Sequence, residues 1–240
     1  MVNLPAINPK VVIASGDLTD AKTPSNLDSK QFESEWKMYK EIWSNCGATK
    51  SVQWLDIRGN HGNKIKYFLF FCPVLMKQNI NVTDVFNVIS HNSTKNYFRR
   101  FGVQGSSRPP GPYMVTVQSS NYTKYAFVAV DATPDIGPKR ILNFVGQLND
   151  AKMAKLEKLQ HSAQHHLKVN ASIWFGHYPT SSISSASPGL RQVASKSLAY
   201  LCGHFHSFYG VVPHMYTKHH SGLLELELGD WKWNRMFVLL

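Results

Sequence analysis

The feature that most constrains this chain is a pattern that occurs four times: a short apolar stretch, then a glycine, then a side chain that can bind a metal. Short, continuous apolar stretches are typical of strands that are buried on both faces of a sheet. Ligands of open α/β sheets bind beyond the carboxyl ends of such strands. The pattern therefore predicts that four distant points of the chain converge on one site. The four polar ends are Gly16-Asp17, Gly59-Asn60-His61, Gly176-His177 and Gly203-His204-Phe205-His206.

The side chains at these four ends are chemically suited to a metal ion. Neutral imidazole is the commonest protein ligand of Zn, Fe and Mn, and His204 and His206 stand two positions apart on one loop. Asn60 offers a carbonyl oxygen, and His61 can act as a general acid or hold a phosphoryl oxygen. Each motif by itself also fits a structural turn, and Asp17 also fits a carboxylate that only hydrogen-bonds its own turn.

Other polar residues fit structural roles better. Asp131 follows an expected strand and can line a site, but aspartate is also a frequent turn former. His161 and His165 lie one helical turn apart without a third candidate ligand nearby, which indicates a solvated helix face. His219 and His220 precede a strand and are interpreted as structural too.

Apolar strand-like stretches alternate with helical ones along the chain, which predicts a single α/β domain over residues 1–240. The expected strands are 11–14, 52–57, 113–118, 125–130, 171–175, 198–201, 223–228 and 236–240. The expected helices are 28–45, a short one after Ser93, 147–166 and 189–197, and 102–112 is expected to be a loop because it is rich in proline and glycine.

Composition excludes some classes of protein and leaves others open. With 43% hydrophobic residues the chain can bury a sizeable core. The formal net charge of +11 is compatible with a nucleic-acid or anionic-membrane partner. No dense Lys/Arg run or RNA-binding motif accompanies this charge, so a basic surface without a specific nucleic-acid partner is favoured. The three cysteines form no CxxC motif, which argues against a disulfide framework and a cysteine-built zinc site.

Signals for cellular location are weak. Residues 1–10 lack the apolar core of a secretory signal. The longest apolar run, 65–76, contains Lys66 and is too short for a bilayer, which takes ~20 residues. Four N-x-S/T sequons hint at a glycoprotein with a lumenal or extracellular history, although chance matches are common. The sequons are at Asn81, Asn92, Asn121 and Asn170.

Taken in order, GD, GNH, GH and GHxH resemble the motifs of the calcineurin-like metallophosphoesterase superfamily. The longer strings resemble one branch, the transmembrane protein 62-like phosphoesterases, over nearly all of residues 11–232. This resemblance implies a metallophosphoesterase-type β-sandwich flanked by helices and a phosphoester substrate. It also implies membrane association only through spans elsewhere in the family's chains. The strings are SGDLTDAKT, WLDIRGNH, VDATPDIGPKR, IWFGHYP, YLCGHFH and LELELGDWK.

The resemblance also implies roles for individual residues. Asp17 would bridge two metal ions, and His61 would assist the leaving group or hold a phosphate oxygen. Two ions ~3.5–4 Å apart would activate a water and clamp the phosphoryl oxygens during in-line attack. Mn, Fe or Zn would suit such ligands, and the sequence does not choose among them. One ion would be completed by Asn60, His177 and His204, and the other would use His206.

The chain departs from the family pattern at its start. The family opens with a strand that carries Asp-x-His and supplies two metal ligands, whereas residues 1–10 contain neither Asp nor His. We therefore expect a chain that is incomplete at its N-terminus and lacks the first strand, which would leave backbone groups of the sheet unpaired. One metal site would then be intact. The other would keep only Asp17 and His206, and turnover would be weak or absent.

A second departure follows the GNH motif. The family continues with an Asp that orients the His, but here Gly62 follows His61. Asp84 stands 22 residues later, and removal of residues 62–83 would give RGNHDVFN. We interpret residues 62–83 as an in-frame insertion, from unspliced sequence, with Asp84 as the orienting residue. A genuine lineage-specific loop is the alternative.

Three classes of function remain open at this stage. The first is a metal-dependent phosphoester hydrolase, impaired in this chain. The second is a non-catalytic metal-binding or scaffold module with the same fold. The third, a basic nucleic-acid binder, has only the net charge in its favour.

Overall fold

The computed structural model describes residues 9–21, 31–45, 52–60, 94, 96–119, 122–134, 145–186, 189–205 and 214–229, with 214 and 215 as backbone only. The strands are β1 (Val11–Ala14), β2 (Gln53–Asp56), β3 (Tyr113–Gln118), β4 (Lys124–Val130), β5 (Gly146–Leu148), β6 (Ala171–Gly176), β7 (Ile183–Ser185), β8 (Ala199–Cys202), β9 (His214–Lys218) and β10 (Leu224–Leu228). The helices are α2 (Glu33–Asn45), α3 (Tyr97–Phe101), α4 (Val103–Ser107), α5 (Asp150–His161) and α6 (Leu190–Val193), with short turns η4 (Ser162–His166), η5 (Thr180–Ser182) and η6 (Ala194–Lys196).

A six-stranded mixed sheet forms the centre of the fold, in the order β3-β4-β6-β8-β10-β9. Its four inner strands are parallel to one another, and the two edge strands β3 and β9 are antiparallel to their neighbours. Two small parallel sheets, β1-β2 and β5-β7, complete the strand pairing of the described residues. The loops that follow β6 and β8 therefore leave the large sheet at the same edge.

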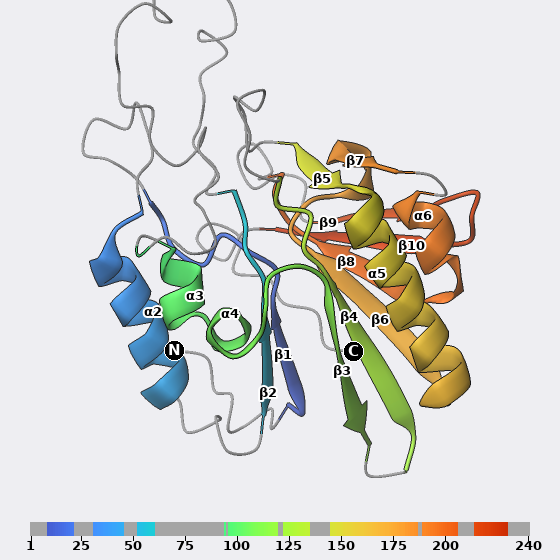
Figure 1. Ribbon diagram of the computed structural model, residues 1–240, viewed down its shortest axis with the longest axis horizontal. Helices are drawn as coiled ribbons and strands as arrows, with labels where there is room; N and C mark the ends of the chain where they lie inside the picture. The colour runs from blue at the N-terminus through green and yellow to red at the C-terminus, as the bar shows by residue number, and fades with distance from the viewer. Residues whose placement is uncertain are drawn as a thin grey trace, which may run out of the picture.

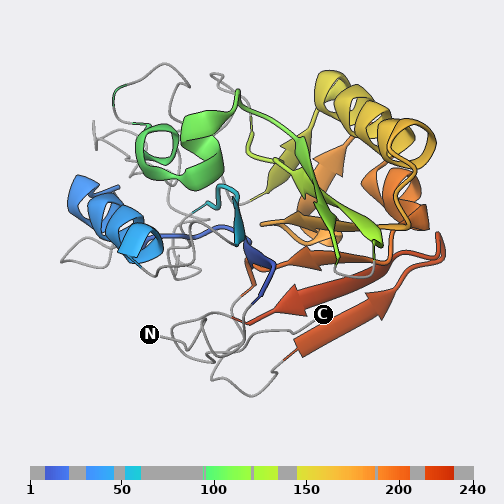
Figure 2. The same ribbon diagram turned by 90° about the horizontal axis from the view of Figure 1, so that it is seen from below.

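The molecule has layers on both faces of the large sheet. Helices α5 and α6 cover one face, and the β1-β2 sheet with α2, α3 and α4 lies on the other (Figures 1 and 2). Because successive strand residues point to opposite faces, β4 supplies Val128 to the core under the helices and Phe127 to the core between the sheets. The expected α/β architecture, two layers of strands flanked by helices, is confirmed.

The core between the two sheets holds the β1-β2 layer in place. Leu55 and Ile57 from the β2 segment pack with Phe127, Phe175 and Leu201 of the large sheet. Residues of β1 pack against this cluster, although all four are half-buried rather than buried on both faces as expected. The reason is that β1 pairs with β2 in a small sheet and does not enter the large one.

Two expected segments differ from the structure. Residues 147–166 are not one helix: Gly146–Leu148 pairs with β7, Asn149 caps α5 by accepting a hydrogen bond from Lys152 N, and the last turn is a π turn. The expected loop 102–112 contains the helix α4. Strand β9 was not expected, and the expected strand 236–240 lies outside the described residues.

The helix α4 forms because a buried carboxylate meets its first N–H groups. Asp56, at the end of β2, accepts hydrogen bonds from Val103 N at 2.7 Å, Gln104 N at 2.8 Å and Tyr39 Oη at 2.9 Å. Burial raises the pKa of Asp56 although these donors oppose the rise. One side chain therefore links β2 to α2 and α4. The helix propensity of a Pro- and Gly-rich segment gives no sign of this link.

Among the described residues, no helix has the length and apolarity needed to cross a membrane.

We predict that D56N lowers the free energy of unfolding by about 2 kcal/mol, because an amide NH₂ would face backbone donors and leave one unpaired. Urea denaturation at neutral pH measures this change. E41Q, which alters an exposed carboxylate on α2, is the matched control. Equal stability of D56N and E41Q would show that Asp56 does not make this link.

Candidate metal centre

Four of the residues singled out in the sequence lie at the carboxyl edges of the two sheets. Asp17 follows β1, Asn60 follows β2, His177 directly follows β6, and His204 follows β8. Asn60, His177 and His204 are buried. The parallel direction of these strands brings side chains from both layers to one edge.

Three atoms that can bind a metal ion lie close together. Asn60 Oδ1 lies 2.8 Å from His177 Nε2 and 3.0 Å from His204 Nδ1, and the two imidazole nitrogens are 3.1 Å apart. Residues that are 117 and 144 positions apart in the chain thus bring three atoms into a nearly equilateral triangle.

The tautomer of His177 is fixed by its other nitrogen. His177 Nδ1 lies 3.0 Å from the carbonyl oxygen of Ser15, which can only accept a hydrogen bond. Nδ1 therefore carries the proton, and in the neutral ring the lone pair of Nε2 points at Asn60 Oδ1. Two acceptors at 2.8 Å repel each other unless a cation or an extra proton lies between them. A backbone carbonyl behind the imidazole is also the usual partner of a metal-binding histidine.

The donor set fits a metal ion. With metal–ligand bonds of ~2.0–2.2 Å, neighbouring ligand atoms at right angles are about 3 Å apart, which matches the observed triangle. Asn60 Nδ2 is buried and has no hydrogen-bond partner within the described ranges, so the amide is oriented by its oxygen. Counting only His, Cys, Asp and Glu, the described part of the chain contains no cluster of three that could hold a metal. The third donor here is the amide of Asn60.

The carboxylate of Asp17 lies beside this triangle. Its Oδ2 is 3.5 Å from His177 Nε2, and its side chain is 19% exposed. The backbone of Asp17 is left-handed, with φ of 47°, a conformation that non-glycine residues adopt at a cost. Gly59 allows this approach, because a Cβ at Gly59 would collide with Asp17. Gly16, with φ of 102°, allows the His177 ring to approach in the same way.

The second imidazole is also held under backbone strain. His204 has φ of 80°, and the Gly203 N–H before it donates to the His177 carbonyl at 3.0 Å. The buried ring of Tyr178 packs against both imidazoles, with centroid distances of 4.9 Å to each. This ring shields one side of the site, which strengthens electrostatic interactions inside it.

Asp131 has the structural role that its position after β4 suggested. It accepts hydrogen bonds from Arg58 Nη2 at 3.0 Å, Gly111 N at 3.1 Å and Thr133 N at 3.2 Å. Although burial alone would raise it, the pKa of Asp131 is held well below its usual range by Arg58 and then Lys152. The ion pair fixes the segment two residues before Asn60 and leaves a guanidinium close to the candidate site.

Several predicted residues cannot be followed in the structure. His61, Asp84, His206 and the segment 62–83 lie outside the described residues, so their roles stay predictions. The structure brings together the donors assigned to one ion, and Asp17 beside them. His161, the last residue of α5, and His165, in the turn η4, are exposed with ring centroids 4.4 Å apart, in agreement with a solvated face.

The sequence analysis missed a second group of polar residues behind the site. Glu225 on β10 is buried and bonded to Thr180, and His219 contacts the same carboxylate at 2.6 Å. The signal was present in the LELEL strand, where glutamates alternate with leucines. A glutamate that an inner strand buries, as β10 buries Glu225, requires hydrogen-bond partners within the protein.

Comparison with known proteins gives the chain two relatives. No family model matches it. It is 39% identical over 96% of its length to transmembrane protein 62 of Mus musculus. It is 32% identical over 95% of its length to a protein of Arabidopsis thaliana named as a candidate metallophosphoesterase. The chain spans 31% and 28% of these curated relatives. The similarity supports a metallophosphoesterase-like family.

Glu227 supplies a titratable group near the loop that carries His204. It lies two residues after Glu225 on β10 and is half-buried. Burial, followed by the neighbouring charge of Glu225, raises the pKa of Glu227 to about 7, and the backbone N–H of Phe205 opposes this rise.

We predict that E227Q removes a pH-dependent part of the stability. The folded state keeps this proton up to about pH 7, whereas the ordinary pKa is 4.5. The stabilisation is therefore present below pH 4.5 and is lost as the pH rises toward 7. Urea denaturation of metal-free protein across this range should give a flatter profile for E227Q than for wild type. E157Q, at an exposed glutamate of α5, should keep the wild-type profile. Identical slopes for all three proteins would contradict the assignment.

Proposed function

We propose that this chain is a metal-dependent phosphoester hydrolase domain that extends over residues 1–240. The observation that supports this proposal best is the triangle of Asn60 Oδ1, His177 Nε2 and His204 Nδ1 with the Asp17 carboxylate beside it. The order of the motifs and the similarity to a candidate metallophosphoesterase support the same class of chemistry. The substrate is a phosphoester whose identity depends on loops around the site.

Each residue has a proposed role. Asn60, His177 and His204 would hold one divalent ion, of Mn, Fe or Zn type, and Asp17 would supply a carboxylate to this ion and to a second one. A bound ion would supply the positive charge that stabilises phosphoryl oxygens and activates a water nucleophile. Ser15 keeps the lone pair of His177 Nε2 directed inward by accepting the Nδ1 proton. Arg58, anchored by Asp131, adds positive charge that attracts a phosphate.

Two further residues complete the proposal. His61 donates a proton to the leaving oxygen, or holds a phosphoryl oxygen, and Asp84 orients it. His206 is the imidazole of the second ion. We also propose that residues 62–83 are an insertion that separates His61 from Asp84.

The number of ions held by these residues is the point on which activity depends. No Asp-x-His sequence occurs anywhere in the 240 residues, so Asp17 and His206 are the ligands left for the second ion. A polypeptide of these residues alone should therefore hold one ion firmly and turn over slowly. The same observation favours the alternative, a non-catalytic metal-binding or scaffold module of this fold.

We predict that the purified polypeptide binds about one Mn²⁺ per chain and hydrolyses p-nitrophenyl phosphate slowly, with full inhibition by a chelator. H177A should weaken Mn²⁺ binding by more than about 100-fold, since loss of outer partners alone costs ~10–100-fold. Titration calorimetry gives the stoichiometry and affinity. H161A, at an exposed histidine, is the matched control. Undetectable Mn²⁺, Zn²⁺ and Fe²⁺ binding by folded wild type would refute the metal site, and fast turnover would refute the impairment.

We predict that H61A lowers turnover and leaves metal binding intact, which would separate catalysis from metal binding. General acid catalysis contributes typically ~10²–10⁴-fold, so H61A should lower kcat by at least about 100-fold while the Mn²⁺ affinity stays within about twofold. A rate that is unchanged in H61A but abolished in H177A would assign the residual turnover to bound metal alone. That result would favour the scaffold module.

A further inference from the structure

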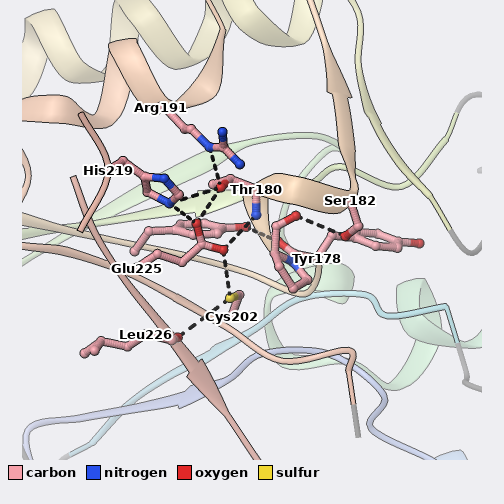
Figure 3. A network of polar contacts seen from close by, with 10 residues as sticks. Tyr178, Thr180, Ser182, Arg191, Cys202, His219, Glu225 and Leu226 are labelled. Atoms are coloured by element: carbon pink, nitrogen blue, oxygen red, sulfur yellow. Dashed lines mark hydrogen bonds and ion pairs between the residues drawn. The ribbon is translucent and has the colours of Figure 1, made fainter. Parts of the chain in front are cut away.

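A buried carboxylate on β10, that of Glu225, forms the centre of a network of polar contacts (Figure 3). Glu225 Oε1 accepts the backbone N–H of Thr180 at 2.8 Å, and Glu225 Oε2 accepts the hydroxyl of the same residue. His219 Nε2 lies 2.6 Å from Oε2, and Cys202 Sγ lies 3.6 Å from Oε1. Glu225 is 7% exposed, so its two oxygens depend on these partners rather than on water for hydrogen bonds.

Two partners of Glu225 lie close in sequence to the imidazole ligands. Thr180 stands three residues after His177, at the far end of the loop that leaves β6. Cys202 stands two residues before His204, at the end of β8. Because β10 is the neighbour of β8 and not of β6, the carboxylate reaches across one strand to the Thr180 loop. A single side chain thus contacts both segments whose spacing sets the distance between the two imidazoles.

The loop that leaves β6 is held by different partners in its two halves. The His177 carbonyl accepts Gly203 N–H at 3.0 Å, and the Tyr178 carbonyl accepts the Tyr200 hydroxyl at 2.6 Å. Both of these donors come from the β8 segment and fix the first half of the loop. The second half, at Thr180, is fixed to β10 through the carboxylate.

Two further side chains complete the network, one bonded to Thr180 and the other in contact with the carboxylate itself. Arg191 of α6 donates through Nε to Thr180 Oγ1 at 2.8 Å, so the hydroxyl proton is directed to Glu225. His219 approaches the carboxylate from the segment after β9. A carboxylate has two accepting oxygens, whereas a glutamine of the same shape has one accepting oxygen and one donating NH₂ group. E225Q therefore changes the hydrogen bonding at one of the two oxygens and leaves the size of the side chain nearly constant.

We propose that Glu225 is a positioning residue of the metal centre: by accepting both Thr180 donors while contacting Cys202, it sets the loop of His177 relative to that of His204. This inference rests on the proposed function, since it assigns Glu225 to the same site. It does not make Glu225 a ligand. The imidazole triangle at 2.8–3.1 Å is the geometry that the carboxylate maintains.

The test compares E225Q with wild type and with E157Q, which removes an exposed carboxylate of α5. We expect the Mn²⁺ dissociation constant of E225Q to rise about tenfold, the lower end of the effect of outer partners on metal sites. The visible absorption spectrum of the Co²⁺-loaded protein should also shift in E225Q and remain unchanged in E157Q, because it reports ligand geometry directly. Thermal unfolding of each variant shows whether it is folded.

A second pair of variants removes the same link from the loop side. T180V deletes the hydroxyl at nearly constant volume and should repeat the E225Q changes in affinity and Co²⁺ spectrum, in a smaller measure. T180S keeps the hydroxyl and should restore wild-type behaviour. If E225Q does not fold, T180V and T180S decide the question alone.

The outcomes separate this inference from the proposed function. If wild type binds metal, and folded E225Q or T180V binds it with unchanged affinity and spectrum, the positioning role is overturned and the metal site stands. If wild type binds no metal, the proposed function fails. The ¹⁵N resonances of the His177 ring in metal-free, ¹⁵N-histidine-labelled protein then test positioning. They should move in E225Q and not in E157Q. If they do not move in E225Q, the positioning role of Glu225 is overturned too.

Discussion

The imidazole of His177 joins the two layers of strands at their carboxyl edges, and the arrangement of the candidate site depends on it. Its Nδ1 bonds the Ser15 carbonyl after β1, while its Nε2 meets Asn60 after β2 and His204 after β8. These groups come from both sheets, so the donors meet only while the small sheet packs on the large one. The apolar cluster between the layers thus maintains the site as well as the fold.

Buried carboxylates stabilise the segments that surround this imidazole. Asp56 accepts the first N–H groups of α4, Asp131 accepts Arg58 and Gly111, and Glu225 accepts Thr180. Each acts from the end or the interior of a strand on a loop from elsewhere in the chain. Burying a charge is costly unless several donors surround it, so each carboxylate favours one loop conformation over others. The left-handed backbones of Asp17 and His204 likewise require surroundings that hold them in place.

Local pattern predicted the strands well where apolar runs were continuous. The expected bounds of β3 match the structure, and those of β4, β6, β8 and β10 differ by one residue at one or both ends. For β4, β6 and β8 the reason is that inner strands covered on both faces need apolar side chains nearly throughout. The helix α4 and the strand β5 were missed. Their stabilising partners, Asp56 for α4 and β7 for β5, lie 47 and 37 residues away in the chain, so no local window contains them.

The sequence by itself determined which atoms are available: two imidazoles, an amide oxygen and a carboxylate, each placed just after an apolar strand. It also determined the α/β class, because the alternation of strands and helices follows from local periodicity. Only the tertiary structure decided that Ser15 orients His177, that Arg58 pairs with Asp131, and that Glu225 faces Thr180. The physical reason is that a buried polar group takes whichever partner the packing of distant segments brings within hydrogen-bond reach, and local sequence does not encode that distance.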